Sequence, residues 1–242
     1  MCRMRFVVLA LAALLVAAAV ALAQEQPPAP VPAPPPAPTA TVAPDETPAP
    51  TVTPVVPGVP PDFGAITWRA SRALGRPAAN GRLRDGVRLP ELGEDFFTWD
   101  PVHNRIPNRE WRRWGTDRLI RTVLTVLHEF RTDHDSAQRI GVMDLSRPNG
   151  GRFGRNYGGL GHASHQNGLD VDILYPRADG LELHPRRPGQ VDRRLAQDLV
   201  DRFVAAGATY VFTGPRLRLQ GPRKVVVKLA HHDDHLHVRI AG

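Results

Sequence analysis

Two short segments, far apart in the sequence, alternate apolar residues with residues that can bind a metal ion. Leu169–Leu174 reads Leu-Asp-Val-Asp-Ile-Leu, and Leu236–Ile240, which follows His235, reads Leu-His-Val-Arg-Ile. Successive side chains of a strand point to opposite faces, so each segment is expected to be a strand with one apolar and one polar face. If the two strands are neighbours, Asp172 and His237 converge on one surface of a sheet.

A further histidine precedes the first of these strands. His165 lies in the expected loop before Asp172, and Gly168 would let this loop turn sharply onto the same surface. Two imidazoles and one carboxylate, from His165, Asp172 and His237, leave a fourth tetrahedral position open for water, which is typical of catalytic rather than structural zinc. The ligand set alone also tolerates manganese or cobalt.

Other periodic patterns predict the remaining elements. Apolar residues recur at helical spacing from Thr116 to about His134, with Thr116 as the N-cap. A second helix is expected from Val191 to Ala206, with Gly207 as its stop. Further strands are expected at 140–145, 210–213 and 225–229. The expected fold class is α+β: a single domain with a small, mainly antiparallel sheet that carries the zinc site and is flanked by helices.

The first 61 residues are expected to lie outside this domain. Residues 1–23 have the pattern of an export signal, with Arg3 and Arg5 before an apolar run that ends in a small-x-small cleavage pattern. A retained membrane anchor is the alternative. Residues 24–61 hold 15 of the 25 prolines, which favours a semi-rigid linker, or else a tail without a role. Residues 62–242 then form the predicted domain.

Cysteine content and charge narrow the chemistry and the partners. Cys2 is the only cysteine, so removal of the export signal leaves none, and the metal must be held by His, Asp or Glu. Residues 62–242 carry a net charge of +8, which favours anionic partners. No helix-turn-helix or regular Lys/Arg array is present, so nucleic acid is not an expected partner. An exported, basic domain suits an anionic cell-wall polymer better.

The two motifs also resemble those of a known family. They read His162-Ala-Ser-His165-Gln-x-Gly168-Leu-Asp170-Val-Asp172 and His232-x-x-His235-x-His237-Val-Arg239. Both resemble the penicillin-insensitive murein endopeptidases, which belong to the LAS superfamily of zinc peptidases. Residues 83–90, 108–115 and 144–153 resemble the family as well, so the resemblance spans most of residues 66–240. It implies that residues 62–242 form a zinc peptidase domain.

The resemblance implies a role for each matching histidine and aspartate. His165, Asp172 and His237 would bind Zn²⁺. His235 would be the catalytic residue, as a general base or by stabilising the transition state. No serine or cysteine nucleophile would be required, because zinc lowers the pKa of its bound water and polarises the scissile carbonyl.

Other residues are expected to support the site rather than to bind zinc as principal ligands. His162 and His232 match further site histidines of the family and are assigned to orienting hydrogen bonds or alternate metal ligation. Arg147 lies in a Gly-rich loop that resembles the family's substrate-side loop, where it would pair with a peptide carboxylate or stay solvated. Ser164 is interpreted as loop support, because no Gly-x-Ser-x-Gly elbow surrounds it. His184 is expected to be a surface residue rather than a metal ligand.

The function that the resemblance implies is that of a zinc-dependent murein endopeptidase. It would hydrolyse peptide cross-links of peptidoglycan, such as D-alanyl-meso-diaminopimelyl bonds, by zinc-activated water. Its partners would be peptidoglycan peptide stems, in the periplasm, at the cell wall or outside the cell. Membrane contact is expected only through the N-terminal segment if it is uncleaved, and the oligomeric state stays open. Two alternatives remain: a zinc D-Ala-D-Ala carboxypeptidase, and a non-catalytic zinc-containing module that binds the cell wall.

Overall fold

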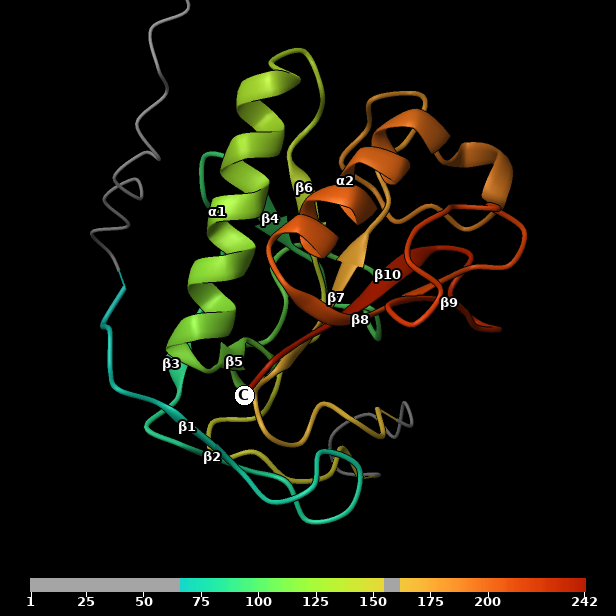
Figure 1. Cartoon of the computed structure of the whole chain (residues 1–242). Coiled ribbons are helices and arrows are strands. Elements are labelled where there is room, and N and C mark those ends of the chain that lie inside the picture. Colours follow the sequence, from blue (N-terminus) through green and yellow to red (C-terminus); the bar gives the residue numbers. More distant parts are fainter. Residues whose placement is uncertain (1–65, 155–161) are drawn as a thin grey trace, which may run out of the picture. The chain divides into compact units, whose positions relative to one another are not determined.

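The computed structural model describes residues 66–154 and 162–242 (Figure 1). The expected export signal and the Pro-rich linker lie outside the described residues, so both stay predictions, and the predicted domain is described from residue 66 onward. Within the described ranges, no helix combines the length and the apolar character that crossing a membrane requires.

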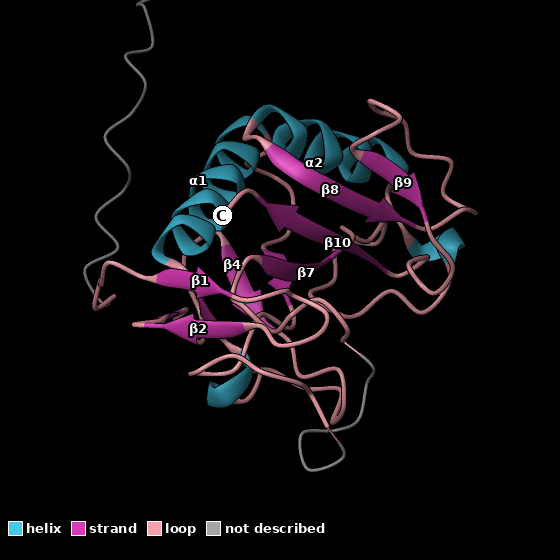
Figure 2. Cartoon of the chain, turned by 60° about the horizontal axis from the view of Figure 1, so that its bottom comes forward, coloured by secondary structure: helices cyan, strands magenta, loops and turns pink. Residues whose placement is uncertain are grey.

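A six-stranded sheet runs through the domain, with the strand order β4-β6-β7-β10-β8-β9 (Figures 1 and 2). Along the chain, the bounds are β4 Phe96–Thr98, β6 Ile140–Val142, β7 Asp170–Leu174, β8 Ala208–Thr213, β9 Val226–Lys228 and β10 His235–Ile240. All five predicted strands are confirmed, although their ends differ from the predicted ones. β4 was not predicted.

The sheet is mixed: its central pairs are antiparallel, as expected, but its two outer pairs are parallel, which was not predicted. The pairs β6-β7, β7-β10 and β10-β8 are antiparallel, whereas the outer pairs β4-β6 and β8-β9 are parallel. Parallel neighbours need a crossover connection. Helix α1, Asp117–Asp133, lies in the connection between β4 and β6, and residues 214–225 connect β8 to β9. The alternation of apolar and polar residues carries no information about strand direction, so this feature was not predictable from it.

Helix α1 and helix α2, Arg193–Ala205, cover one face of the sheet (Figure 2). The predicted start of α1 is confirmed, because the Thr116 hydroxyl accepts a hydrogen bond from the backbone amide three residues on, at 3.2 Å. α2 begins two residues later than predicted, since the Asp192 carboxylate caps the amide three residues on, at 3.0 Å. Gly207, at φ +84°, follows the end of α2 as expected.

The main hydrophobic core lies between these helices and the sheet. The buried side chains come from α1 (Ile120, Val123, Leu124, Leu127, Phe130), α2 (Leu195, Leu199, Val200, Phe203), β7 (Val171, Ile173) and β10 (Leu236, Val238, Ile240). The apolar faces of β7 and β10 therefore point toward the helices, as predicted. Their polar faces, with Asp172 and His237, point to the other side of the sheet.

Smaller elements surround the sheet. They are the ribbons β1 Arg72–Leu74 with β2 Arg82–Arg84 and β3 Val87–Arg88 with β5 Trp114–Gly115, and the 3-10 helices η1 Glu110–Arg112 and η3 Pro188–Gln190. None of them was predicted, because each has at most three residues and, unlike β6 and β9, lies outside a longer run of apolar residues.

Removal of one core side chain tests this packing. Phe130 is completely buried between α1 and the rest of the core. We expect Phe130→Ala to lower the free energy of unfolding by about 3–5 kcal/mol, through lost burial and the cavity left behind. Glu129→Ala, an exposed neighbour on the same helix, should change it by less than about 0.5 kcal/mol. Urea unfolding of the two variants measures the difference, and equal stabilities would contradict the packing.

Candidate metal centre

The pairing of β7 with β10 brings the two sequence motifs together on the sheet face away from the helices. His237 is the direct cross-strand partner of Asp172, as Leu236 is of Ile173. The predicted convergence of Asp172 and His237 is therefore confirmed. Both residues are buried, with exposed fractions of 2% for Asp172 and 7% for His237.

His165 reaches the same point from the loop that precedes β7. Gly168 ends this loop at φ +75°, in the left-handed region that favours glycine. A Cβ atom at this position would lie 2.8 Å from the Leu83 side chain, so the turn also needs the space that glycine leaves. The predicted turn is confirmed, and it buries His165 beside Asp172 and His237.

The donor atoms of these three residues form a small triangle. Nδ1 of His237 lies 3.0 Å from Oδ1 of Asp172, and Nε2 of His165 lies 3.3 Å from the same oxygen. The two nitrogens are 3.1 Å apart. Ligands about 2.0–2.1 Å from a tetrahedral zinc ion stand about 3.3 Å from one another. The triangle therefore fits three ligands of one zinc ion after a small outward adjustment.

His162 offers an additional donor next to this triangle. The ligand atoms of His162, His165 and Asp172 all lie within 4.8 Å of one another, so these three could also hold a metal ion. Nδ1 of His162 is 3.5 Å from Oδ2 of Asp172, whereas His237 contacts Oδ1. His162 and His237 thus approach different oxygens of one carboxylate. The His237 triangle is the tighter of the two, and His162 is available as a fourth or an alternate ligand.

The hydrogen bonds behind the ligands determine which ring nitrogen each histidine presents. Nδ1 of His165 lies 2.8 Å from the carbonyl oxygen of Leu145, which only accepts, so Nδ1 carries the proton and Nε2 is left for a metal. Nε2 of His237 lies 3.0 Å from Oδ1 of Asp170, which leaves Nδ1 for the metal. Asp170 in turn accepts a hydrogen bond from Arg239. Both nitrogens left for the metal belong to the triangle.

His162 is oriented by a completely buried ion pair. Its Nε2 lies 2.8 Å from Oδ2 of Asp144, which also forms an ion pair with the Arg112 guanidinium. The Asn108 amide donates to Oδ1 of Asp144 at 3.0 Å. Burial alone would raise the pKa of Asp144, but hydrogen bonds from Arg112 and His162 lower it to about 2. Asp144 therefore stays ionised and turns Nδ1 of His162 toward Asp172.

The charges inside the triangle suit the binding of a cation. Burial alone would raise the pKa of Asp172, but the charge of His165 and hydrogen bonds from His165 and His237 hold that pKa well below its usual value. Burial alone would lower the pKa of His237, but hydrogen bonds to Asp170 and Asp172 raise it to about 9. A metal ion would replace the His237 proton between the same groups.

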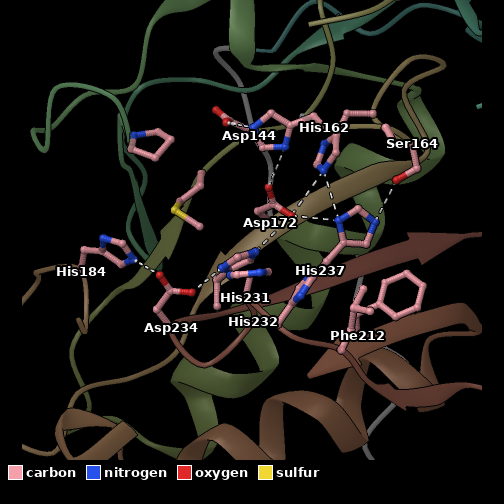
Figure 3. A pocket seen from close by; sticks show the side chains of 16 residues that line it. Asp144, His162, Ser164, Asp172, His184, Phe212, His231, His232, Asp234 and His237 are labelled. Carbon is pink, nitrogen blue, oxygen red and sulfur yellow. Dashed lines mark hydrogen bonds and ion pairs between the residues drawn. The ribbon is translucent and has the colours of Figure 1, made fainter. Parts of the chain in front are cut away.

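His235 lies at the edge of the triangle and faces it. Its Nε2 is 3.9 Å from Oδ1 of Asp172, and its Nδ1 is 2.7 Å from Oδ1 of Asp234. His235 and the triangle line one cavity of about 500 Å³, whose other walls include Phe212 and His184 (Figure 3). A carbonyl group that entered the cavity would meet the donor cluster and His235 together.

His232 belongs to the wall of this cavity. Its ring centroid is 4.8 Å from that of His235 and 6.1 Å from that of His237. Burial lowers the pKa of His232. The Tyr175 hydroxyl donates to the His232 carbonyl at 3.1 Å and thereby ties the turn before β10 to the end of β7. His232 thus packs beside the catalytic candidate His235 rather than among the three triangle atoms.

Two further residues named from the sequence, Arg147 and Ser164, differ in their position relative to the cavity. Arg147 does not line the described part of the cavity, and its guanidinium donates to the Arg152 carbonyl at 3.0 Å. Its substrate role stays a prediction. Ser164 does line the cavity, and its hydroxyl lies 3.2 Å from Nε2 of His237.

Sequence reasoning missed the acidic residues that orient the histidines. Asp170 had a usable signal, because it alternates onto the same strand face as Asp172. Asp144 had no such signal, since its partners Arg112 and His162 lie on other segments. Asp234 adjoins His235 in the sequence but precedes the alternating strand, so alternation does not identify it. His184 was expected on the surface rather than among the ligands, and the surface position is wrong: its side chain is 15% exposed, lines the cavity and contacts Asp234, 50 residues away.

Two comparisons with known proteins give the family of the chain. The family model described as penicillin-insensitive murein endopeptidase matches residues 73–206, a range that includes the His162–Asp172 motif and ends before β10. The chain is also similar to a penicillin-insensitive murein endopeptidase of Salmonella heidelberg (strain SL476). The two are 25% identical over 221 residues, which cover 80% of this chain and 71% of the relative. The chain therefore belongs to the penicillin-insensitive murein endopeptidase family.

Proposed function

We propose that this protein is a zinc-dependent murein endopeptidase that cleaves peptide cross-links of peptidoglycan, such as the D-alanyl-meso-diaminopimelyl bond. Family membership makes it a hydrolase of peptide bonds. One observation carries the rest: the triangle of His165, Asp172 and His237 donor atoms, with sides of 3.0–3.3 Å, lies beside His235 in one cavity. This is the donor set of a zinc site that keeps a position open.

In this proposal His165, Asp172 and His237 hold the ion, and His162 is the additional or alternate ligand. A bound zinc ion would acidify a water molecule and polarise a carbonyl group. His235 would accept a proton at Nε2 during attack and return it to the leaving amine. His232 would keep His235 packed against the cavity wall, and the carboxylates of Asp144 and Asp170 would fix the histidine rings.

A serine mechanism is the competing chemistry that the contacts suggest, since Ser164, His237 and Asp172 lie in a row. The competition for Nε2 of His237 argues against it. Asp170 lies 3.0 Å from this nitrogen and Ser164 lies 3.2 Å from it. A carboxylate only accepts, so Nε2 carries a proton and cannot remove the proton of the Ser164 hydroxyl.

The cavity lining favours cross-link cleavage over trimming of a terminal D-Ala. A carboxypeptidase needs a cationic group that recognises the free carboxylate of its substrate. Among the described residues that line the cavity, none is Lys or Arg. An endopeptidase has no such requirement.

The same proposal includes the location of the enzyme. The relative is named for an activity on murein, a polymer outside the cytoplasmic membrane. The export pattern of residues 1–23 and the lack of cysteine after Cys2 suit a periplasmic or wall-associated protein. Its partners would be the peptide stems of peptidoglycan, with membrane contact only through an uncleaved N-terminal segment.

Three substitutions distinguish the proposed roles. His237→Ala should lose both zinc and activity. His235→Ala should keep zinc content and lose about a hundredfold or more in kcat on purified muropeptide dimers, as expected for a general base. Ser164→Ala should lose less than about tenfold, whereas removal of a serine nucleophile costs about a millionfold. Unchanged cleavage by either histidine variant would sink the assignment.

Metal removal should affect both turnover and stability. Chelation is expected to abolish dimer cleavage, and zinc should restore it. Zinc at about 100 times its Kd should stabilise the folded protein by about 2.7 kcal/mol, because it binds the folded state alone. Thermal melts of the wild type and of His165→Ala, with and without zinc, measure this stabilisation. Zinc should change the melting temperature of the variant very little. Full activity in the metal-free protein would contradict zinc catalysis.

Substrate choice separates the endopeptidase from its closest alternatives. Cross-linked dimers should be converted to monomers at least about tenfold faster than pentapeptide monomers lose D-Ala, since the described lining contains no Lys or Arg to pair with a free carboxylate. Mass spectrometry of parallel digests reads both reactions. Faster trimming of pentapeptides would indicate the carboxypeptidase, and sacculus binding without release of soluble fragments would indicate the non-catalytic module.

A further inference from the structure

We infer that Asp234 is a positioning residue that holds the His235 ring with Nε2 toward the donor triangle, and that His184 holds Asp234 in turn. The orientation is a property of the folded chain, and its consequence for turnover rests on the proposed function.

The two carboxylate oxygens of Asp234 contact two different histidines. Oδ1 lies 2.7 Å from Nδ1 of His235, and Oδ2 lies 3.0 Å from Nε2 of His184. Figure 3 shows His184 and Asp234 at the side of the cavity opposite Ser164. The three residues come from two separate segments, because His184 lies in the connection between β7 and α2. The arrangement therefore forms only when the domain is folded.

The contact with Asp234 determines the tautomer of His235. An ionised carboxylate accepts hydrogen bonds and donates none, so Nδ1 of His235 must carry a proton. In the neutral ring, Nε2 is then the basic nitrogen. This nitrogen is the one that faces Oδ1 of Asp172, at 3.9 Å. Without Asp234, the ring would be free to adopt the other tautomer or to rotate away from the triangle.

His184 restrains a carboxylate that is otherwise accessible to water. The Asp234 side chain is 34% exposed, whereas the side chains of His184 and His235 are 15% and 17% exposed. The ring of His184 also packs near Trp99, with centroids 6.3 Å apart. Water competes for the hydrogen bonds of a partly exposed carboxylate. A second protein contact keeps this carboxylate in place, so its hydrogen bond to His235 persists for more of the time.

The neighbouring Asp233 provides a matched control. Its Oδ1 accepts from the Arg216 backbone amide at 3.1 Å, and the residue does not line the described cavity. Asp233 thus belongs to the same turn, has the same side chain and makes no contact with His235 that the structure describes.

The test compares Asp234→Ala and Asp233→Ala in the full-length, zinc-loaded protein with muropeptide dimers as the probe. We expect Asp234→Ala to lower kcat about 10–100-fold, with KM within about twofold and zinc content unchanged, whereas Asp233→Ala stays near wild type. Asp234→Asn keeps an acceptor for Nδ1 and should recover part of the loss. His184→Ala should lose less than Asp234→Ala.

A double-mutant cycle separates positioning from a general structural effect. If Asp234 acts through His235, Asp234→Ala combined with His235→Ala should be no slower than His235→Ala alone. Multiplied losses in the double variant, or equal activities of the Asp234 and Asp233 variants, would overturn the inference.

A second readout does not depend on turnover. In ¹H–¹⁵N spectra of the imidazole groups, the His235 signals, identified by their loss in His235→Ala, should report a protonated Nδ1 in the wild type and a changed tautomer in Asp234→Ala. The same His235 tautomer in both proteins would overturn the inference. If the wild type cleaves no dimers, the proposed function fails, and these spectra still decide whether Asp234 orients His235.

Discussion

The register of β7 against β10 is the constraint on which the site depends. His237 stands opposite Asp172 in that register, while the intervening Val171 and Val238 point into the core beneath the helices. A slip by one residue would turn the valines outward and drive the charged groups into the apolar core, at a cost of several kcal/mol for each unpaired buried polar group. The core that stabilises the domain thus also holds the side chains of Asp172 and His237 3.0 Å apart, a spacing that suits two ligands of one metal ion.

A second set of contacts gives the histidines their directions. The Leu145 carbonyl, Asp170 and Asp234 each contact one ring nitrogen of a different histidine and leave the other nitrogen facing the cluster. Arg239 and Arg112 compensate the buried carboxylates of Asp170 and Asp144. Burial alone would raise the pKa of Asp144, but hydrogen bonds from Arg112 and His162 lower it, so this carboxylate remains an acceptor. The resulting cluster combines fixed geometry with a local charge that suits a divalent cation.

Local patterns explain what could be predicted from the residues alone. The helices α1 and α2 show their apolar spacing over three turns or more, and their capping residues lie within the same stretch of chain. Apolar and polar residues alternate clearly in the central strands β7 and β10, whereas β4 and the short ribbons do not extend far enough to show a period. Asp170 was recognisable in principle from strand alternation, but His184 was not, because its partner Asp234 belongs to a distant segment.

The sequence by itself determined the composition of the site: His165, Asp172, His235 and His237 stand in two motifs whose alternation separates polar side chains from core. Only the tertiary structure decided which nitrogen each ring presents, how close the donors come and that His162 flanks the same carboxylate. It also decided the parallel outer strands and the contact of His184 with Asp234. Alternation depends on neighbours along the chain, whereas ring orientation depends on hydrogen bonds between segments that meet only after folding.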